Sequence, residues 1–297
     1  MGASGLVGQH VVEQLRTRGH TVTAVARSRR AGIDHTLDAT TSTVDSWRPL
    51  LAGHDGVVFA AGLDDRDVPN RPAYPVFYAG NVAPVVNLLT AAREQGLTRA
   101  VVLGSYYTYF NRTHPEWDLP VIHPYIRSRV EQAREGRAAA GPDLPVAVLE
   151  LPFVFGRAGD RLPNWAGPLI KWVRSKSPLL APVGGSAATT ATRVAETTVE
   201  ALEQASGADI PVVDENLTWA DLIGRIATAA GNPRPVRTLP SGVVRAGLRL
   251  TGLLQQVTGK QSGLVPAKLA DLLLRELFIE TATPRSVDAA IAETVAP

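Results

Sequence analysis

The first eight residues constrain the fold more than any other part of this chain. Gly2, Gly5 and Gly8 are spaced three apart and lead directly into an apolar, helix-forming segment. Glycine at the first position permits a tight turn, at the second leaves room for a diphosphate, and at the third lets the helix lie close to a sheet. The free N–H groups at the start of that helix would face the anion. The pattern predicts a dinucleotide site, and the alternative is a glycine-rich loop without a ligand.

Such a turn ordinarily follows a buried strand, but only Met1 precedes Gly2 in this sequence. A dinucleotide-binding fold places its first strand in the middle of the sheet. We therefore expect a slot in the core where that strand would lie. We also expect that the natural protein begins upstream of Met1.

Hydrophobic periodicity over the first half of the chain predicts strands that alternate with helices, which is typical of an α/β fold with a doubly wound parallel sheet. The predicted strands are residues 21–26, 33–37, 56–62, 99–104 and 146–151, and the predicted helices are 6–18, 43–52, 79–95 and 121–140, with a loop at 63–75.

Proline and glycine become frequent after residue 156, and apolar helices dominate the last part of the chain. We expect a helix at 192–204, a strand at 210–213 and a helix that is capped by the segment Asn216-Leu217-Thr218 and ends near residue 230. This predicts a nucleotide-binding core of residues 1–157, rejoined by 189–214. A smaller, mostly helical substrate-binding part would comprise residues 158–188 and 215–297, with a crevice between the two parts.

Basic residues follow the predicted second strand, where the adenosine ribose lies in such folds. Arg27, Arg29 and Arg30 stand there without an acidic neighbour. An acidic residue at this place accepts a hydrogen bond from the 2′-hydroxyl of NAD, whereas arginine accommodates the 2′-phosphate of NADP. NADP is therefore the expected cofactor and NAD the alternative. A solvated basic turn would give the same pattern.

Three further residues suggest proton chemistry beside the nucleotide. Ser105 follows a predicted buried strand and so lies at the same sheet edge as the glycine turn. Tyr125 and Arg129 are four residues apart, on one face of a predicted helix. A tyrosine hydroxyl has a pKa of about 10, and a neighbouring cation favours its phenolate. Tyr125 could then exchange a proton while a hydride moves to or from nicotinamide, with Ser105 binding the substrate oxygen.

Together these segments resemble the extended short-chain dehydrogenase/reductases, also called the NAD-dependent epimerase/dehydratase family, over almost the whole chain. The segments that carry the resemblance are Gly-Ala-Ser-Gly-Leu-Val-Gly at 2–8, Asp38, Ala60-Ala61-Gly62, Asn81-Val82, Gly104-Ser105, Tyr125, Leu-Pro-Phe-Val-Phe-Gly at 151–156 and residues 214–231. The resemblance implies a Rossmann core, an NAD(P) cofactor and a Tyr acid/base assisted by Ser.

The resemblance also implies the roles of individual residues. Tyr125 would be the acid/base, Ser105 its partner and Asn81 part of the supporting polar network, while Asp38 and Ala39 would lie near the adenine. The residues expected to bind the cofactor are Gly2, Ser4, Gly5, Leu6, Val7, Gly8, Arg27, Asp38, Ala39, Ala60, Ala61, Gly62, Pro152 and Phe153. Family members often form homodimers, and the helices at 79–95 and 121–140 could supply such an interface.

Two residues depart from the family pattern. Arg129 stands where the family has lysine; it keeps the charge but cannot replace a compact ammonium that bonds the nicotinamide ribose. Glu150 stands where members often have arginine, which argues against a nucleotide-sugar substrate. Aromatic residues such as Tyr106, Tyr107 and Phe153 instead favour a small or apolar carbonyl substrate, although any one of them could belong to the core.

Composition excludes several classes. The chain has no cysteine, which excludes disulfides, thiolate zinc sites and a cysteine nucleophile, and its six histidines show no metal-ligand spacing. A net charge of +2 gives no bulk electrostatic case for nucleic acid. Without an apolar run of spanning length or a secretory signal, we expect a cytoplasmic protein without a membrane partner.

The leading hypothesis is an NADP-preferring oxidoreductase or epimerase. An NADP-binding protein that has lost turnover and acts as a sensor or partner-binding module is the alternative that Arg129 supports. A carrier of apolar ligands is a third reading. His114 and His123 are better explained as turn and helix-start residues than as catalytic groups.

Overall fold

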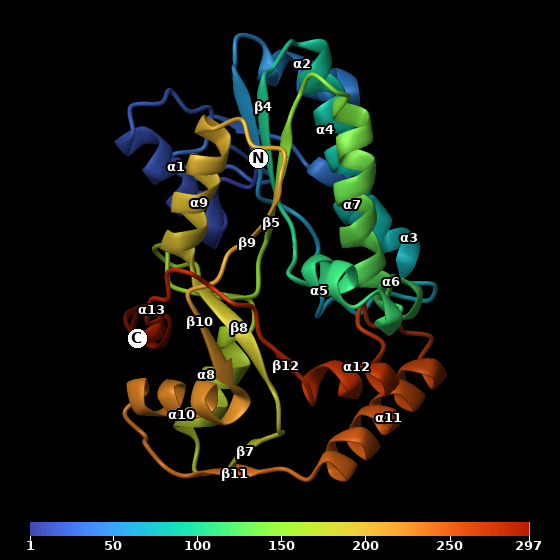
Figure 1. Cartoon of the computed structure of the whole chain (residues 1–297), viewed down its shortest axis with the longest axis vertical. Coiled ribbons are helices and arrows are strands. Elements are labelled where there is room, and N and C mark those ends of the chain that lie inside the picture. The colour runs from blue at the N-terminus through green and yellow to red at the C-terminus, as the bar shows by residue number, and fades with distance from the viewer. Residues whose placement is uncertain (297) are drawn as a thin grey trace.

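The computed structural model describes residues 1–296 (Figure 1). Its central sheet has four parallel strands in the order β3-β4-β5-β9, formed by β3 (Gly56–Phe59), β4 (Arg99–Leu103), β5 (Val146–Glu150) and β9 (Asp209–Pro211). A separate parallel pair is formed by β1 (Val25–Ala26) and β2 (His35–Thr36). The predicted α/β fold with a parallel sheet is confirmed.

Helices cover both faces of the sheet, as its apolar strands require. On one face lie α1 (Leu6–Thr17) and α9 (Ala191–Glu203), and on the other lie α2 (Val44–Leu51), α4 (Ala83–Glu94) and α7 (Pro124–Ala140) (Figure 1). Val11 and Val194 pack on the first face with Leu149, whereas Trp47 and Leu88 pack on the second. This double layer leaves the carboxyl ends of the strands free to form a site.

A slot lies between β1 and β3. The Met1 amine donates to the Val58 carbonyl at 2.7 Å, and the Met1 carbonyl accepts from the Ala60 N–H at 2.9 Å. On the other side, the Gly2 N–H donates to the Val25 carbonyl at 2.9 Å. Beyond these bonds the two sheets are separated by a cavity of about 540 Å³. Burial lowers the pKa of the Met1 amine to about 5.

The strand predicted at 21–26 is wrong in length, because only Val25 and Ala26 form one. A strand needs a neighbour to pair with, and residues 21–24 have the slot on one side and no strand on the other; Ala24 instead bonds the turn before β2, its N–H donating to Asp34 Oδ2 at 2.7 Å and its carbonyl accepting from the Asp34 N–H at 2.9 Å. The strand predicted at 33–37 is similarly reduced to His35–Thr36. Both segments show that an extended sequence pattern forms a strand only where a partner strand lies alongside.

Two predicted helices differ from the observed ones. The helix predicted at 79–95 begins earlier, as α3 (Tyr74–Phe77), and continues through a π-helical turn, η2 (Tyr78–Val82), into α4. The helix predicted at 121–140 is interrupted, since α6 (Leu119–Ile122) ends at His123 and α7 starts at Pro124. Proline begins helices readily because it lacks an N–H, which explains the new start.

Shorter elements connect these helices and strands. They are η1 (Ala39–Thr41), α5 (Tyr107–Thr113) and η3 (Pro115–Trp117). Helix α5, which was not predicted, directly follows the turn at Ser105.

The C-terminal part forms a second layer below the central sheet (Figure 1). Its sheet contains β6 (Phe153–Phe155), β8 (Gly185–Thr190), β10 (Glu215–Thr218) and β12 (Glu276–Leu277), while β7 (Leu179–Ala181) pairs with β11 (Val236–Thr238). The helices are α8 (Ala166–Arg174), α10 (Trp219–Ala229), α11 (Ser241–Val257), α12 (Pro266–Leu273) and α13 (Asp288–Val295). Thr218 caps α10 by accepting from the Asp221 N–H, as predicted.

One helical stretch in the described residues, Tyr74–Glu94, is long and apolar enough to cross a membrane. More than half of its most apolar window is buried within the protein. Its α4 part packs against α2 and α7. Burial of this kind accounts for its apolar composition without a bilayer.

Candidate functional site

The glycine turn has the geometry that its spacing predicts. Gly2 has φ +93°, and a Cβ there would lie 2.3 Å from the Ala60 carbonyl oxygen. A Cβ on Gly8 would lie 2.1 Å from the Gly2 oxygen, so α1 touches the turn itself. The close packing predicted for Gly8 is therefore present, but against the turn and not against the sheet. No side chain caps the start of α1, which leaves its first N–H groups available to an anion.

A cavity of about 940 Å³ joins this turn to the carboxyl ends of the strands and to the C-terminal helices. Most of the predicted site residues line it, namely Ser4, Gly5, Leu6, Val7, Gly8, Arg27, Ala60, Ala61, Gly62, Ser105, Tyr125, Arg129, Pro152 and Phe153. Gly2, Asp38, Ala39 and Asn81 are not among its lining residues. Uncapped amides and small residues along one wall fit the diphosphate and nicotinamide of a dinucleotide.

Tyr125 lies in the wall of this cavity near the start of α7. Its ring meets those of Phe77 and Tyr107 edge-on, with centroids 5.9 Å and 6.3 Å away. Burial raises the pKa of the Tyr125 hydroxyl, while the charge of Arg129 and hydrogen bonding with Ser105 act to lower it. The backbone N–H of Tyr125 donates to the Gly263 carbonyl at 3.0 Å, which fixes the chain between α11 and α12 against this residue.

Arg129 shares that face of α7, and its guanidinium carbon lies 5.1 Å from the centre of the Tyr125 ring. Its Nη2 donates to the Leu63 carbonyl at 3.0 Å and its Nη1 donates to Gln132 Oε1 at 3.1 Å. Its Nε is buried with no hydrogen-bond partner among the described residues. The positive charge of the guanidinium thus lies beside the tyrosine ring, but both of its Nη atoms already donate hydrogen bonds to protein groups.

Asn81 belongs to a polar network behind the cavity. Its side-chain oxygen accepts from the Leu63 N–H at 2.7 Å, and its amide nitrogen donates to Ser128 Oγ at 3.0 Å. Gln132 Nε2 completes the network by donating to the Asn81 carbonyl at 2.8 Å. Asn81 therefore anchors the loop that follows Gly62.

Arg27 lines the cavity at the end of β1, which is where the sequence predicts the adenosine ribose. Asp38 caps η1 by accepting from the Thr40 N–H at 3.0 Å. Hydrogen bonds from Thr40 lower the pKa of Asp38, and the charge of Arg27 contributes to the same shift. The two side chains are therefore close enough to interact.

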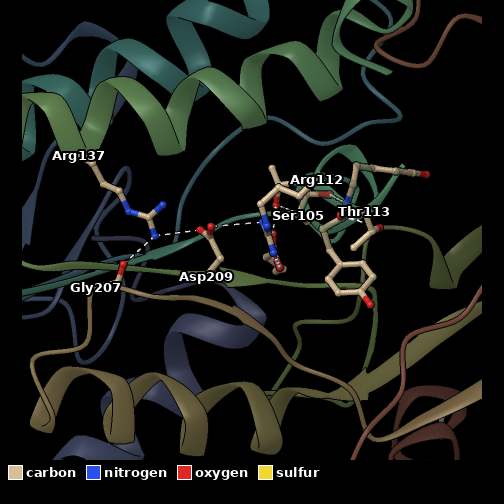
Figure 2. A network of polar contacts seen from close by, with 10 residues as sticks. Ser105, Arg112, Thr113, Arg137, Gly207 and Asp209 are labelled. Carbon is tan, nitrogen blue, oxygen red and sulfur yellow. Dashed lines mark hydrogen bonds and ion pairs between the residues drawn. The ribbon is translucent and has the colours of Figure 1, made fainter. Parts of the chain in front are cut away.

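Glu150 is fully buried and makes its hydrogen bonds to other residues of the protein. Its Oε1 accepts from Thr108 Oγ1 at 2.6 Å and from Arg112 Nη1 at 2.5 Å, while its Oε2 accepts from Arg112 Nη2 at 3.0 Å. Figure 2 shows Arg112 and Arg137 reaching Asp209 from opposite sides, at 3.3 Å and 2.9 Å. Thr108 Oγ1 also lies 2.7 Å from the Ser105 carbonyl oxygen, which shares the single hydroxyl proton with Glu150, so this network holds the turn that carries Ser105.

Asp65, which was not predicted from the sequence, lines the cavity beside Tyr125. Burial, followed by the neighbouring Asp64, raises the pKa of the Asp65 carboxyl, while hydrogen bonds from Arg66 hold the pKa of Asp64 well below its usual range. Both lie in the polar loop predicted at 63–75, at the edge where ligands bind in such sheets. The position of this loop at the ligand-binding edge was the one sequence feature that could have pointed to these two residues.

Arg161 is a second residue that was missed. It lines the same cavity, and its Nε is buried without a hydrogen-bond partner among the described residues. The region after residue 156 carries no pattern that singles it out.

Neither His123 nor His114 lines the cavity. His123 Nδ1 accepts from the Val265 N–H at 3.0 Å, and burial lowers the pKa of its imidazole to about 4. His114 stacks on Trp117 with centroids 4.1 Å apart. His123 acts as a neutral acceptor that holds the start of α12.

The chain is similar to known proteins in both sequence and fold. Residues 2–145 match a family model described as NAD(P)H-binding. A 3-diazoavenalumate denitrifying reductase of a Streptomyces species is 28% identical over 262 residues, covering 82% of this chain and 84% of the reductase. Among solved structures, gox2253 superposes with a TM-score of 0.78 at 19% identity, covering 99% of this chain and 95% of gox2253.

A UDP-glucose-4-epimerase from Stenotrophomonas maltophila with bound NAD superposes with a TM-score of 0.65 at 19% identity, covering 99% of this chain and 95% of the epimerase. At these identities the solved structures show a shared fold.

Proposed function

We propose that this chain, whose residues 2–145 match an NAD(P)H-binding family model, is an NADP-preferring reductase of the extended short-chain dehydrogenase/reductase type that acts on a small, apolar or aromatic substrate. The observation that carries the proposal is the single 940 Å³ cavity in which the glycine turn, Ser105, Tyr125 and Arg129 meet. Cofactor groups and proton-transfer groups must share one space for hydride and proton to move together.

In the proposed mechanism Tyr125 donates the proton to the substrate oxygen, and Ser105 donates a hydrogen bond to the same oxygen. Bound NADPH supplies the hydride. Arg129 stabilises the phenolate that remains on Tyr125, because a cation beside a buried hydroxyl favours its ionised form. Asn81 holds the loop after Gly62 in place by accepting a hydrogen bond from the Leu63 N–H. The Leu63 carbonyl of the same loop accepts a hydrogen bond from Arg129.

The preference for NADP rests on Arg27, which lines the cavity at the end of β1. A 2′-phosphate there would gain a charge-assisted bond. Asp38 Oδ1 already accepts from the N–H and the hydroxyl of Thr40, and the charge of Arg27 also lowers the pKa of this carboxyl, so the acidic residue near this strand end is engaged with protein groups.

The substrate class rests on the cavity wall, where Tyr106, Phe153, Trp165 and Trp219 present aromatic surface. Such a wall suits a planar or apolar molecule. Glu150 lies fully buried in its network with Arg112 and contributes nothing to binding a nucleotide sugar. The Streptomyces relative, named for reduction of a diazo compound, makes aromatic diazo compounds worth testing beside aromatic aldehydes and ketones.

The test begins with fluorescence titration of NADPH and NADH, followed by NADPH oxidation with those substrates. Tyr125→Phe should abolish turnover while NADPH affinity stays nearly unchanged. Tyr78→Phe is the matched control, because the Tyr78 hydroxyl bonds Glu135 at 3.0 Å and lies outside the cavity. Unchanged rates in Tyr125→Phe would remove this residue from the mechanism, and failure to bind either cofactor would refute the proposal as a whole.

A second candidate function is an NADP-binding protein without turnover. The hydrogen bonds from both Arg129 Nη atoms to Gln132 and Leu63 support it, since few N–H donors of the guanidinium remain to bond a ribose. Arg129→Lys separates the two functions. A catalytic protein should keep activity in this variant, whereas activity that arises only in Arg129→Lys would support the silent form.

A further inference from the structure

Helix α11 presents an unpartnered apolar stripe to solvent. Val243, Leu250, Leu253, Leu254 and Val257 recur at helical spacing, and their exposed fractions run from 55% to 86%. No residue of this helix is buried, although it spans 17 residues. Scattered exposed apolar residues are ordinary, but a continuous stripe along one helix marks an interaction surface.

The opposite side of α11 faces the protein. Leu248, Thr251 and Gln255 line the 940 Å³ cavity, and the helix packs against α12. Figure 1 shows α11 at the lower outer edge of the molecule, away from the central sheet. The helix therefore separates the candidate active site from whatever covers the stripe.

The charge around α11 is strongly one-sided. Residues 241–265, which comprise α11 and the segment that follows it, contain Arg245, Arg249 and Lys260 and no Asp or Glu, although the whole chain has a net charge of only +2. Arg249 and Lys260 form no ion pair within residues 1–296, while Arg245 pairs with Asp271 at 2.6 Å. A shallow cavity of about 290 Å³ adjoins the stripe at Leu253 and is lined by Arg71, Arg249 and Lys260.

These observations identify the chemistry of the partner. Leucines and valines along the face match the acyl boundary of a bilayer, and the cations beside Leu253 match anionic headgroups. A second copy of the chain is disfavoured, because two such helices would bring Arg249 and Lys260 of both copies together, while Asp271 is already paired with Arg245. We propose that α11 docks this protein on the surface of a membrane that contains anionic phospholipid.

A docked helix of this kind lies in the interface and needs no spanning segment. The expectation of no membrane partner was based on the lack of a long apolar run, which does not report amphipathic surface helices. Docking would bring the wall of the cavity at Leu248 and Thr251 to the membrane surface.

The test is sedimentation of the full chain with vesicles of phosphatidylglycerol and phosphatidylcholine in equal amounts, and with vesicles of phosphatidylcholine alone. We expect binding to the anionic vesicles, weakened by salt. Leu254→Glu should reduce it about tenfold or more, since one buried leucine contributes roughly that factor. Arg249→Gln with Lys260→Gln should reduce it about thirtyfold, from about fivefold for each charge near the surface.

Val121→Glu is the matched control, because Val121 is 85% exposed on α6 and lies outside the stripe; its binding should equal that of the unmodified chain. NADPH titration of every variant shows whether the fold and the cofactor site are intact, independently of docking. Equal binding to both kinds of vesicle, or no vesicle binding, would overturn the proposal. A dimer in light scattering that Leu254→Glu dissociates, without vesicle binding, would identify a second copy as the occupant instead.

Discussion

Replacing Gly8 by alanine tests the glycine turn most directly. The new Cβ would lie 2.1 Å from the Gly2 carbonyl oxygen, 2.8 Å from the Gly2 carbonyl carbon and 3.0 Å from the Ala3 Cα. All three atoms are backbone, so no side-chain rotation relieves the contact. Either α1 moves away from the turn or the turn opens, by roughly 1 Å, since unbonded heavy atoms need more than about 3 Å.

Two free-energy terms oppose each other in Gly8→Ala. Alanine inside a helix is favoured over glycine by about 1 kcal/mol. Overpacking of a filled site costs about 1–3 kcal/mol. The free energy of unfolding should therefore fall by up to about 2 kcal/mol, which corresponds to a decrease in Tm of roughly 2–4 °C for each kcal/mol.

The effect on cofactor affinity should be larger than the effect on stability. The displaced N–H groups belong to the segment that lines the cavity at Gly5 and Leu6. Losing one hydrogen bond to a charged phosphate costs about 1.5–3 kcal/mol, so NADPH should bind about 10- to 150-fold more weakly. Fluorescence titration of NADPH measures the affinity, and thermal unfolding measures the stability.

Gly247→Ala provides the control, because a Cβ at that position of α11 meets no atom within 4 Å. It should raise stability slightly through helix propensity and leave NADPH affinity unchanged. Gly8→Ala that binds NADPH within about threefold of the unmodified chain would refute the assignment of this turn to the cofactor.

Three further predictions concern charged residues. Arg27→Glu should weaken NADPH far more than NADH in parallel titrations, because it places a carboxylate against the 2′-phosphate; an equal loss for both would contradict the assignment of this strand end. Glu150→Gln should lower the free energy of urea unfolding by about 2 kcal/mol, since it removes the buried carboxylate that accepts charge-assisted hydrogen bonds from the half-exposed Arg112, and Asp209→Asn at the partly exposed side of the network should cost clearly less. A Glu150→Gln protein as stable as Asp209→Asn would show that the buried charge is not needed. Asp65→Asn tests the raised pKa of that carboxyl. The unfolded chain loses its proton near pH 4 while the folded chain keeps it to higher pH, so this group lowers the stability of the unmodified protein as pH rises between those two pKa values. The stability advantage of Asp65→Asn in urea unfolding should therefore be absent near pH 4 and grow toward pH 8; a difference that does not change with pH would show that Asp65 titrates normally.

The parts of this protein that depend on neighbouring residues in the chain could be predicted from the sequence. The turn at Gly2 needs a positive φ and a close approach to Ala60, which a residue without a side chain allows, so the spacing of the glycines predicts the turn directly. The cap at Thr218 and the strands β4 and β5 are local in the same sense, because side-chain oxygens and apolar runs act within a few residues. The alternation of such segments also predicted the parallel sheet.

Only the tertiary structure decided what depends on partners far apart in the chain. Residues 21–24 have an extended pattern but no strand beside them, so they do not pair. Asp65 enters the cavity, and Arg129 bonds Leu63, through contacts between a loop and a helix about sixty residues apart. The stripe on α11 looks like a core face in sequence, and only the fold leaves it exposed, because burial depends on which surfaces meet and not on which residues are apolar.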